Sequence, residues 1–154
     1  MGYILTIDIG GTRLRVATFR QGSTQPEQVK RISTQSRQGD VFSRLIDLID
    51  SILPDETVQA IAVACPGPVN PDKGIVYSMP NIPGWINFPI MELLQKKYRV
   101  PVFLENDANL AAVGEWTYGA GRGFNDIIYV TISTGIGGGI ISAGRLLTGS
   151  RGLA

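Results

Sequence analysis

The sequence predicts a mixed α/β fold, for three reasons. Short runs of apolar and β-branched residues, such as residues 3–8 and 60–65, are typical of buried strands. Segments with apolar residues at helical spacing, such as residues 42–53, separate these runs. The two kinds of segment follow the order β-β-β-α-β-α-β-α-β-β, and no internal repeat of fixed period replaces it.

The first part of the chain predicts three strands and a helix. Residues 3–8 and 14–19 form a hairpin around Gly10-Gly11-Thr12, and residues 29–32 give a third strand. Asp40 is a suitable N-cap for a helix that ends at Pro54.

The middle of the chain predicts a central strand, because residues 60–65 are all apolar and Pro66-Gly67-Pro68 ends the run. A loop rich in proline, glycine and asparagine continues to Pro83-Gly84. The remaining elements are expected to be a helix at 90–98, a strand at 102–104, a helix at 107–116, and strands at 127–133 and 139–142.

A domain boundary is expected near Gly119, where glycines become frequent and charges sparse. Residues 1–118 would form a small N-terminal lobe. Residues 119–154 would form a hinge and the beginning of a second, larger lobe.

Composition excludes several classes of function. The chain has no histidine and one cysteine, so histidine catalysis and histidine or cysteine-cluster metal sites cannot occur within it. A net charge of +1 gives no broad basic field, so neither nucleic acid nor a membrane surface is an expected partner. No apolar run is long enough to span a bilayer, and the cytoplasm is the expected compartment. Cys65 is expected to be a small buried residue.

The first candidate motif is Asp8-Ile9-Gly10-Gly11-Thr12, at the end of the first strand. Backbone N–H groups in such a turn can bind a phosphate, because no side chain blocks the approach. Asp8 would then act through a Mg²⁺ ion or its bound water, since a carboxylate repels phosphate directly. The alternative is an ordinary glycine hairpin with a capping acid.

The second candidate motif is the glycine-rich segment 133–139, which also follows a predicted strand. Together the two segments suggest two halves of a phosphate clamp. Neither matches the P-loop pattern or the dinucleotide-binding G-x-G-x-x-G pattern. The alternative is a glycine-rich bulge at a crowded sheet edge.

The third candidate motif is Glu105-Asn106-Asp107, between a strand and a helix. A carboxylate at this junction can act as general base for a hydroxyl, and Asn106 can hydrogen-bond a polyol. Helix capping by Asn106 or Asp107 is the alternative. The proline-rich segment 78–85 would hold Asn81 over a ligand, whereas Trp85 is expected to fill the core.

These motifs, in this order, resemble the ROK family (repressor, open reading frame, kinase) of sugar kinases over essentially the whole chain. The resemblance implies an actin/hexokinase-like ATPase fold with a ribonuclease H-like motif, and ATP in the cleft between two lobes. It implies Asp107 as catalytic base and sugar contacts from Gly67, Asn81, Asn106 and Asp107. Nucleotide contacts would come from Asp8, Gly10, Gly11, Thr12, Arg13, Thr134, Gly135, Gly137, Gly138 and Gly139. Arg13 and Ser133 depart mildly from the family pattern.

The family usually continues past the position of Ala154 into Gly-Glu-(aliphatic)-Gly-His, a zinc motif and the adenine-binding part of the large lobe. The chain is therefore expected to be an N-terminal fragment that is catalytically silent alone. Structural zinc would belong only to the absent part, and the full-length protein is expected to be a homodimer.

The function that the resemblance implies is ATP-dependent phosphorylation of a hexose, glucose or a related sugar, at its 6-hydroxyl, with Mg²⁺ bridging the phosphates. Two alternatives remain open. One is a sugar-responsive ROK repressor without its DNA-binding domain, although the Gly-Gly-Thr motif begins too early for such a domain to precede it here. The other is a non-catalytic sugar-binding module.

Overall fold

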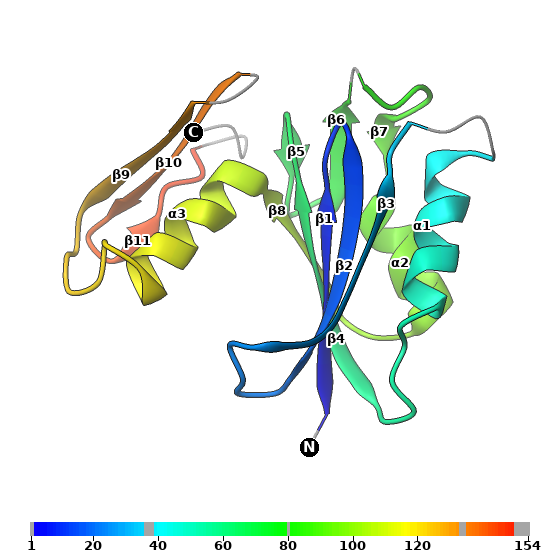
Figure 1. Cartoon of the computed structure of the whole chain (residues 1–154). Helices are drawn as coiled ribbons and strands as arrows, with labels where there is room; N and C mark the ends of the chain where they lie inside the picture. The colour runs from blue at the N-terminus through cyan, green and yellow to red at the C-terminus, as the bar shows by residue number, and fades with distance from the viewer. Residues whose placement is uncertain (1, 36–38, 80, 133–134, 150–154) are drawn as a thin grey trace.

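The computed structural model describes residues 2–35, 39–79, 81–132 and 135–149 (Figure 1). Along the chain, single helices separate groups of strands. None of the helices in these ranges is both long and apolar enough to cross a bilayer. The elements are β1 (Tyr3–Ile9), β2 (Arg13–Arg20), β3 (Pro26–Ser33), α1 (Val41–Asp50), β4 (Val58–Cys65), β5 (Val69–Asn70), β6 (Ile75–Ser78), β7 (Ile86–Phe88), α2 (Ile90–Tyr98), β8 (Val102–Asn106), α3 (Asp107–Tyr118), β9 (Ile127–Ile132), β10 (Ile136–Ser142) and β11 (Arg145–Leu146).

A five-stranded sheet with the order β3-β2-β1-β4-β8 forms the centre of the fold. The first three strands pair antiparallel, whereas β1, β4 and β8 run parallel. Helices α1 and α2 lie on the same side of this sheet (Figure 1). Their fully buried residues Leu45, Ile49 and Leu94 pack into one apolar core with the inward side chains of β1 and β4. The expected mixed α/β fold is confirmed.

The predicted cap of α1 is confirmed. Asp40 Oδ1 accepts hydrogen bonds from the backbone N–H groups of Phe42 and Ser43, at 2.9 and 3.0 Å. The Ser43 hydroxyl also donates to this carboxylate, and these bonds hold the pKa of Asp40 below its ordinary value. The helix ends at Asp50, before the predicted stop at Pro54, and Ser51 is its C-cap, with its N–H donating to the carbonyl oxygen of Asp47.

Two stretches predicted to be loops contain strands. Between residues 66 and 88, β5, β6 and β7 form a small antiparallel sheet whose Val69 and Val76 are fully buried. Strands of two to four residues are too short to show an alternating pattern, and prolines and glycines surround them. Residues 136–138 are also strand, because β10 begins at Ile136 and pairs with β9. Glycine depresses strand propensity but does not prevent pairing.

Helix α3 packs on the second sheet, which has the order β11-β10-β9, and β8 joins it to the first sheet (Figure 1). The contact is close because β10 carries glycines. A side chain at Gly139 would place Cβ 2.7 Å from Ala112 Cβ and 3.0 Å from the carbonyl oxygen of Ala108. Helix α3 thus precedes the boundary predicted near Gly119 but packs on the sheet that follows it. The boundary itself stays a prediction.

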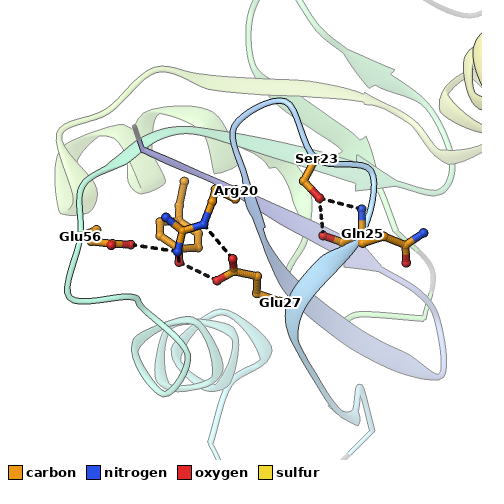
Figure 2. Close-up of polar contacts among 6 residues, drawn as sticks. Arg20, Ser23, Gln25, Glu27 and Glu56 are labelled. Atoms are coloured by element: carbon orange, nitrogen blue, oxygen red, sulfur yellow. Dashed lines mark hydrogen bonds and ion pairs between the residues drawn. The ribbon is translucent and has the colours of Figure 1, made fainter.

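A polar cluster ties together the first three strands at the end of the sheet away from the Gly10 turn (Figure 2). Arg20 donates to Glu27 at 2.8 Å and to the Tyr3 hydroxyl at 2.6 Å, and it forms an ion pair with Glu56 at 3.7 Å. The Tyr3 hydroxyl donates to Glu27, and this bond is the main reason that the pKa of Tyr3 rises to about 12. The register of β1, β2 and β3 is therefore fixed at this end by side chains.

The contact between α3 and β10 predicts opposite effects for two glycine substitutions. Gly139→Ala should lower the free energy of unfolding by about 1–3 kcal/mol, because its methyl group would meet backbone atoms that cannot move independently. Gly114→Ala, on the exposed side of α3 with no atom near its added Cβ, should raise it by about 0.5–1 kcal/mol. Urea unfolding of both variants measures the difference. Equal stability of the Gly139→Ala chain and the parent would contradict this account of the contact.

Candidate functional site

A cleft of about 730 Å³ lies between the carboxyl ends of the central strands and the second sheet. Ten of the predicted site residues line it: Gly10, Gly11, Thr12, Gly67, Asn81, Asn106, Asp107, Gly135, Gly137 and Gly138. Asp8, Arg13 and Gly139 do not line it, and Thr134 lies outside the described residues. Segments far apart in the sequence thus meet at one site.

The parallel alignment of β1, β4 and β8 explains this convergence. The residues that directly follow parallel strands gather at one edge of a sheet. Gly10 follows β1, Gly67 comes shortly after β4, and Asp107 follows β8. The second sheet, held against α3, places Gly137 and Gly138 across the cleft from them.

Two hydrogen bonds from Thr34 hold the Gly10-Gly11-Thr12 turn in place. The Thr34 hydroxyl donates to the carbonyl oxygen of Gly10 at 2.6 Å, and its N–H donates to the carbonyl oxygen of Thr12 at 2.8 Å. Sequence reasoning missed this buried threonine, because nothing in its neighbourhood distinguishes it from a surface residue.

The same turn keeps donors available for a ligand. The N–H of Gly10 closes the hairpin by donating to the carbonyl oxygen of Arg13 at 2.8 Å. By contrast, the N–H groups of Gly11 and Thr12 have no hydrogen-bond partner within the described ranges. Gly11 also contacts Asn81 so closely that an added Cβ would lie 2.6 Å from the Asn81 amide nitrogen. A side chain at position 11 would therefore displace Asn81.

Asn106 connects the start of α3 to the loop after β4. Its Oδ1 accepts hydrogen bonds from the N–H groups of Ala108 and Asn109, at 2.9 and 3.2 Å, so the helix-cap alternative is confirmed. Its Nδ2 donates to the carbonyl oxygen of Gly67 at 3.2 Å. Gly67 has φ +82°, a backbone conformation that glycine adopts without strain. A role for Asn106 in binding a polyol stays a prediction.

Asp107 is the first residue of α3 and is exposed to the cleft. Its carboxylate accepts a hydrogen bond from the N–H of Ala108 at 2.8 Å. Burial raises the pKa of Asp8, the charge of Asp107 raises it further, and Arg15, at 3.5 Å, lowers it. Asp107 thus places a carboxylate in the cleft, and its charge acts on Asp8, which lies outside the cleft lining.

Cys65 lies beneath these carboxylates and is fully buried. Burial raises the pKa of its thiol to about 12, and the charges of Asp107 and Asp8 add to this effect. The thiol is protonated at neutral pH and cannot serve as a nucleophile. The expectation that Cys65 is a small buried residue is confirmed.

Gly137 and Gly139 lie on the face of β10 that packs on α3, since an added Cβ at either position would meet residues of that helix, whereas Gly138 lies on the other face. Gly138 is exposed and lines the cleft, as does Gly137, whereas Gly139 is buried against Ala112. The predicted phosphate loop is thus largely a strand, and Gly139 serves the contact between helix and sheet. Any part that Gly135, Gly137 or Gly138 plays in binding phosphate stays a prediction.

Comparison with known proteins shows which family the chain resembles. A model described as the ROK family matches residues 4–154. The chain is 36% identical over 151 residues to a glucokinase of Thermotoga maritima, covering 97% of this chain and 48% of that protein. It is also 33% identical to a xylose repressor of Bacillus subtilis, covering 99% of this chain and 41% of that protein. The chain spans about half the length of the curated relatives it matches.

Solved structures show the same fold. A ROK family glucokinase from Streptomyces griseus in complex with glucose and AMPPNP is 30% identical, with a TM-score of 0.82 over 99% of this chain and 48% of that one. A ROK family transcriptional regulator is 27% identical, with a TM-score of 0.86 over 97% of this chain and 39% of that one. The expected actin/hexokinase-like fold is thereby confirmed.

The raised thiol pKa predicts that Cys65 is unreactive in the folded chain. A disulfide reagent at about pH 8 should leave it unmodified, because the thiol is both buried and protonated. The same chain unfolded in guanidinium chloride should react completely, which provides the control. Modification of the folded chain at the rate of the unfolded chain would contradict the placement of Cys65.

Proposed function

Because the chain belongs to the ROK family, we propose that the complete protein is a sugar kinase that transfers the γ-phosphoryl group of ATP to a hexose. The acceptor would be the 6-hydroxyl of glucose or a related sugar. One observation carries the proposal: a single cleft gathers an exposed aspartate at a helix N-terminus and glycine segments from two sheets. The names of the relatives, which include several glucokinases, agree with it.

The residues that line the cleft fit the phosphates of a nucleotide. The unpartnered N–H groups of Gly11 and Thr12 are suitable donors to phosphate oxygens. Gly135, Gly137 and Gly138 line the opposite wall without side chains that would block an approach. When bound, ATP supplies the phosphoryl group, and the Streptomyces griseus relative was solved with the ATP analogue AMPPNP.

A magnesium ion also fits the chemistry of this end of the cleft. Asp107 lines the cleft, and Asp8 lies outside its lining but close enough for the two charges to interact. The part of the chain that the structure describes holds no group of three or more histidine, cysteine or acidic side chains, so phosphate and water would have to supply the other ligands. Mg²⁺ is commonly held by one or two carboxylates together with substrate phosphates and water. Asp8 would contribute through a bound water molecule.

Asp107 would take the proton from the reacting hydroxyl. It is exposed to the cleft, and the N–H of Ala108 holds one carboxylate oxygen while the other remains available. Asn106 and Asn81 would hold the other sugar hydroxyls, together with Gly67. Asn106 keeps one amide hydrogen after capping the helix, because its Oδ1 accepts two backbone N–H groups and its Nδ2 makes one bond to Gly67. Orientation and neutralisation of charge would supply most of the acceleration.

The resemblance extends the proposal to the complete protein. It would be a cytoplasmic homodimer, and any structural zinc would lie in the part not included in these residues. The chain alone would be catalytically inactive, because it lacks the sugar and adenine contacts that the family places further along.

A ROK transcriptional regulator is the second candidate. The xylose repressor and the regulator structure match this chain over almost its full length, so the fold alone does not discriminate between the two functions. Phosphorylation of a sugar by the complete protein supports the kinase. Sugar-dependent binding to DNA without phosphorylation would favour the regulator, and sugar binding with neither activity would favour a simple binding module.

Replacing the proposed base should stop turnover. In the protein completed to the length of its relatives, Asp107→Asn should lower kcat by about a hundredfold to ten-thousandfold, the typical contribution of a general base. The Kd for glucose should change by no more than a few-fold, because asparagine keeps the shape and most of the hydrogen bonds. A coupled assay of ADP release and calorimetry of glucose binding measure the two effects.

Asp55→Asn is the matched control, since this exposed aspartate lies outside the cleft and should leave both quantities unchanged. Turnover in the Asp107→Asn protein close to that of the parent would remove Asp107 from the proposed role.

A further inference from the structure

Asn109, in the first turn of α3, has an unusual hydrogen-bonding state. Its side chain is 1% exposed, and its Oδ1 is the one buried side-chain polar atom without a hydrogen-bond partner in the ranges that the structure describes. A buried acceptor without a donor is costly, and native proteins contain few of them. Asn109 also lines the cleft that contains Asp107 and Asn106. The unused acceptor thus belongs to a residue of the site.

Glu105 determines which end of the Asn109 amide remains free. The amide nitrogen of Asn109 donates to Glu105 Oε1 at 3.1 Å. An ionised carboxylate can only accept hydrogen bonds, so the amide nitrogen must face Glu105 and the oxygen must face away. The same Oε1 accepts the N–H of Asn106 at 2.8 Å, which holds the carboxylate in place.

Packing alone does not explain an asparagine at this position. The other buried residues of α3 are Ala108 and Ala112, and Gly139 of β10 lies against the Asn109 backbone. These neighbours are small and apolar. An apolar side chain at position 109 would suit them and would avoid the unpaired acceptor that asparagine buries. The polar group is therefore best explained by a donor that the bound state supplies.

We propose that Asn109 Oδ1 accepts a hydrogen bond from a hydroxyl group of the alcohol substrate, and that Glu105 is the positioning residue that keeps this oxygen free. The inference rests on the proposed kinase function and adds a substrate contact to it. Phosphate oxygens are acceptors at neutral pH, so they cannot be the partner of this atom. The remaining sources of an O–H donor are the sugar and a water molecule bound with the nucleotide and its metal.

The test uses the completed protein and measures kcat, the KM for sugar, the KM for ATP, and the sugar Kd by calorimetry. Asn109→Leu removes the acceptor and should raise the KM and Kd for sugar about tenfold, which corresponds to one lost hydrogen bond, with the KM for ATP unchanged. Asn125→Leu, at an exposed asparagine outside the cleft, is the matched control and should change neither.

Two variants of Glu105 test the positioning role. Glu105→Gln keeps an acceptor oxygen for Asn109 and should retain a KM for sugar close to that of the parent. Glu105→Ala removes the acceptor and lets the amide rotate, so it should raise the KM for sugar several-fold. An equal increase in both variants would overturn the positioning role, because rescue by glutamine is its signature.

The remaining outcomes are decisive. An unchanged KM and Kd for sugar in Asn109→Leu would overturn the contact. A change confined to the KM for ATP or to the magnesium dependence would also overturn it, because the donor would then be a bound water molecule. The melting temperature of Asn109→Leu should not fall, and Asn109→Ala gives the same comparison if leucine prevents folding. Failure of the kinase proposal is recognised separately, by an absence of phosphorylation in the parent protein, and the sugar Kd still tests the contact in that case.

Discussion

The close contact between α3 and β10 is the constraint on which the site depends. A strand can approach a helix this closely only where neither carries a large side chain, and Gly139 faces Ala112 at that point. The contact places Gly137 and Gly138 on one wall of the cleft, opposite the turn that follows β1. It also fixes the first turn of α3, which carries Asn106, Asp107 and Asn109. The geometry of the cleft therefore follows from one contact between small residues.

At this helix N-terminus, residues that shape the start of the helix also line the cleft. Asn106 caps α3, ties it to Gly67, and still has hydrogen-bonding capacity for a ligand. The bond between Glu105 and Asn109 spans the same turn. A capping role and a binding role for Asn106 are therefore not exclusive. Because these bonds hold the start of the helix in place, the binding that we propose would require little ordering of the site.

Sequence reasoning succeeded where local physics determines structure. The all-apolar run of β4, the acid that caps α1, and the glycines after β1 have strong local signals, and the structure confirms the elements they predict. It failed where tertiary contacts decide. Strands β5 to β7 are stabilised by burial of residues such as Val69, and the hydrogen bonds from Thr34 join segments distant in the chain. The helix-facing role of Gly139 and the unpaired oxygen of Asn109 likewise exist only once α3 meets β10.

In the mechanism that we propose, sugar and nucleotide meet in the cleft with Asp107 beside the reacting hydroxyl. A crystal structure of the completed protein with glucose and a non-hydrolysable ATP analogue tests it most directly. We expect a sugar hydroxyl about 3 Å from the Asp107 carboxylate, with phosphate oxygens near the N–H groups of Gly11 and Thr12. A sugar bound outside this cleft, or an Asp107 side chain turned away from every sugar hydroxyl, would contradict it.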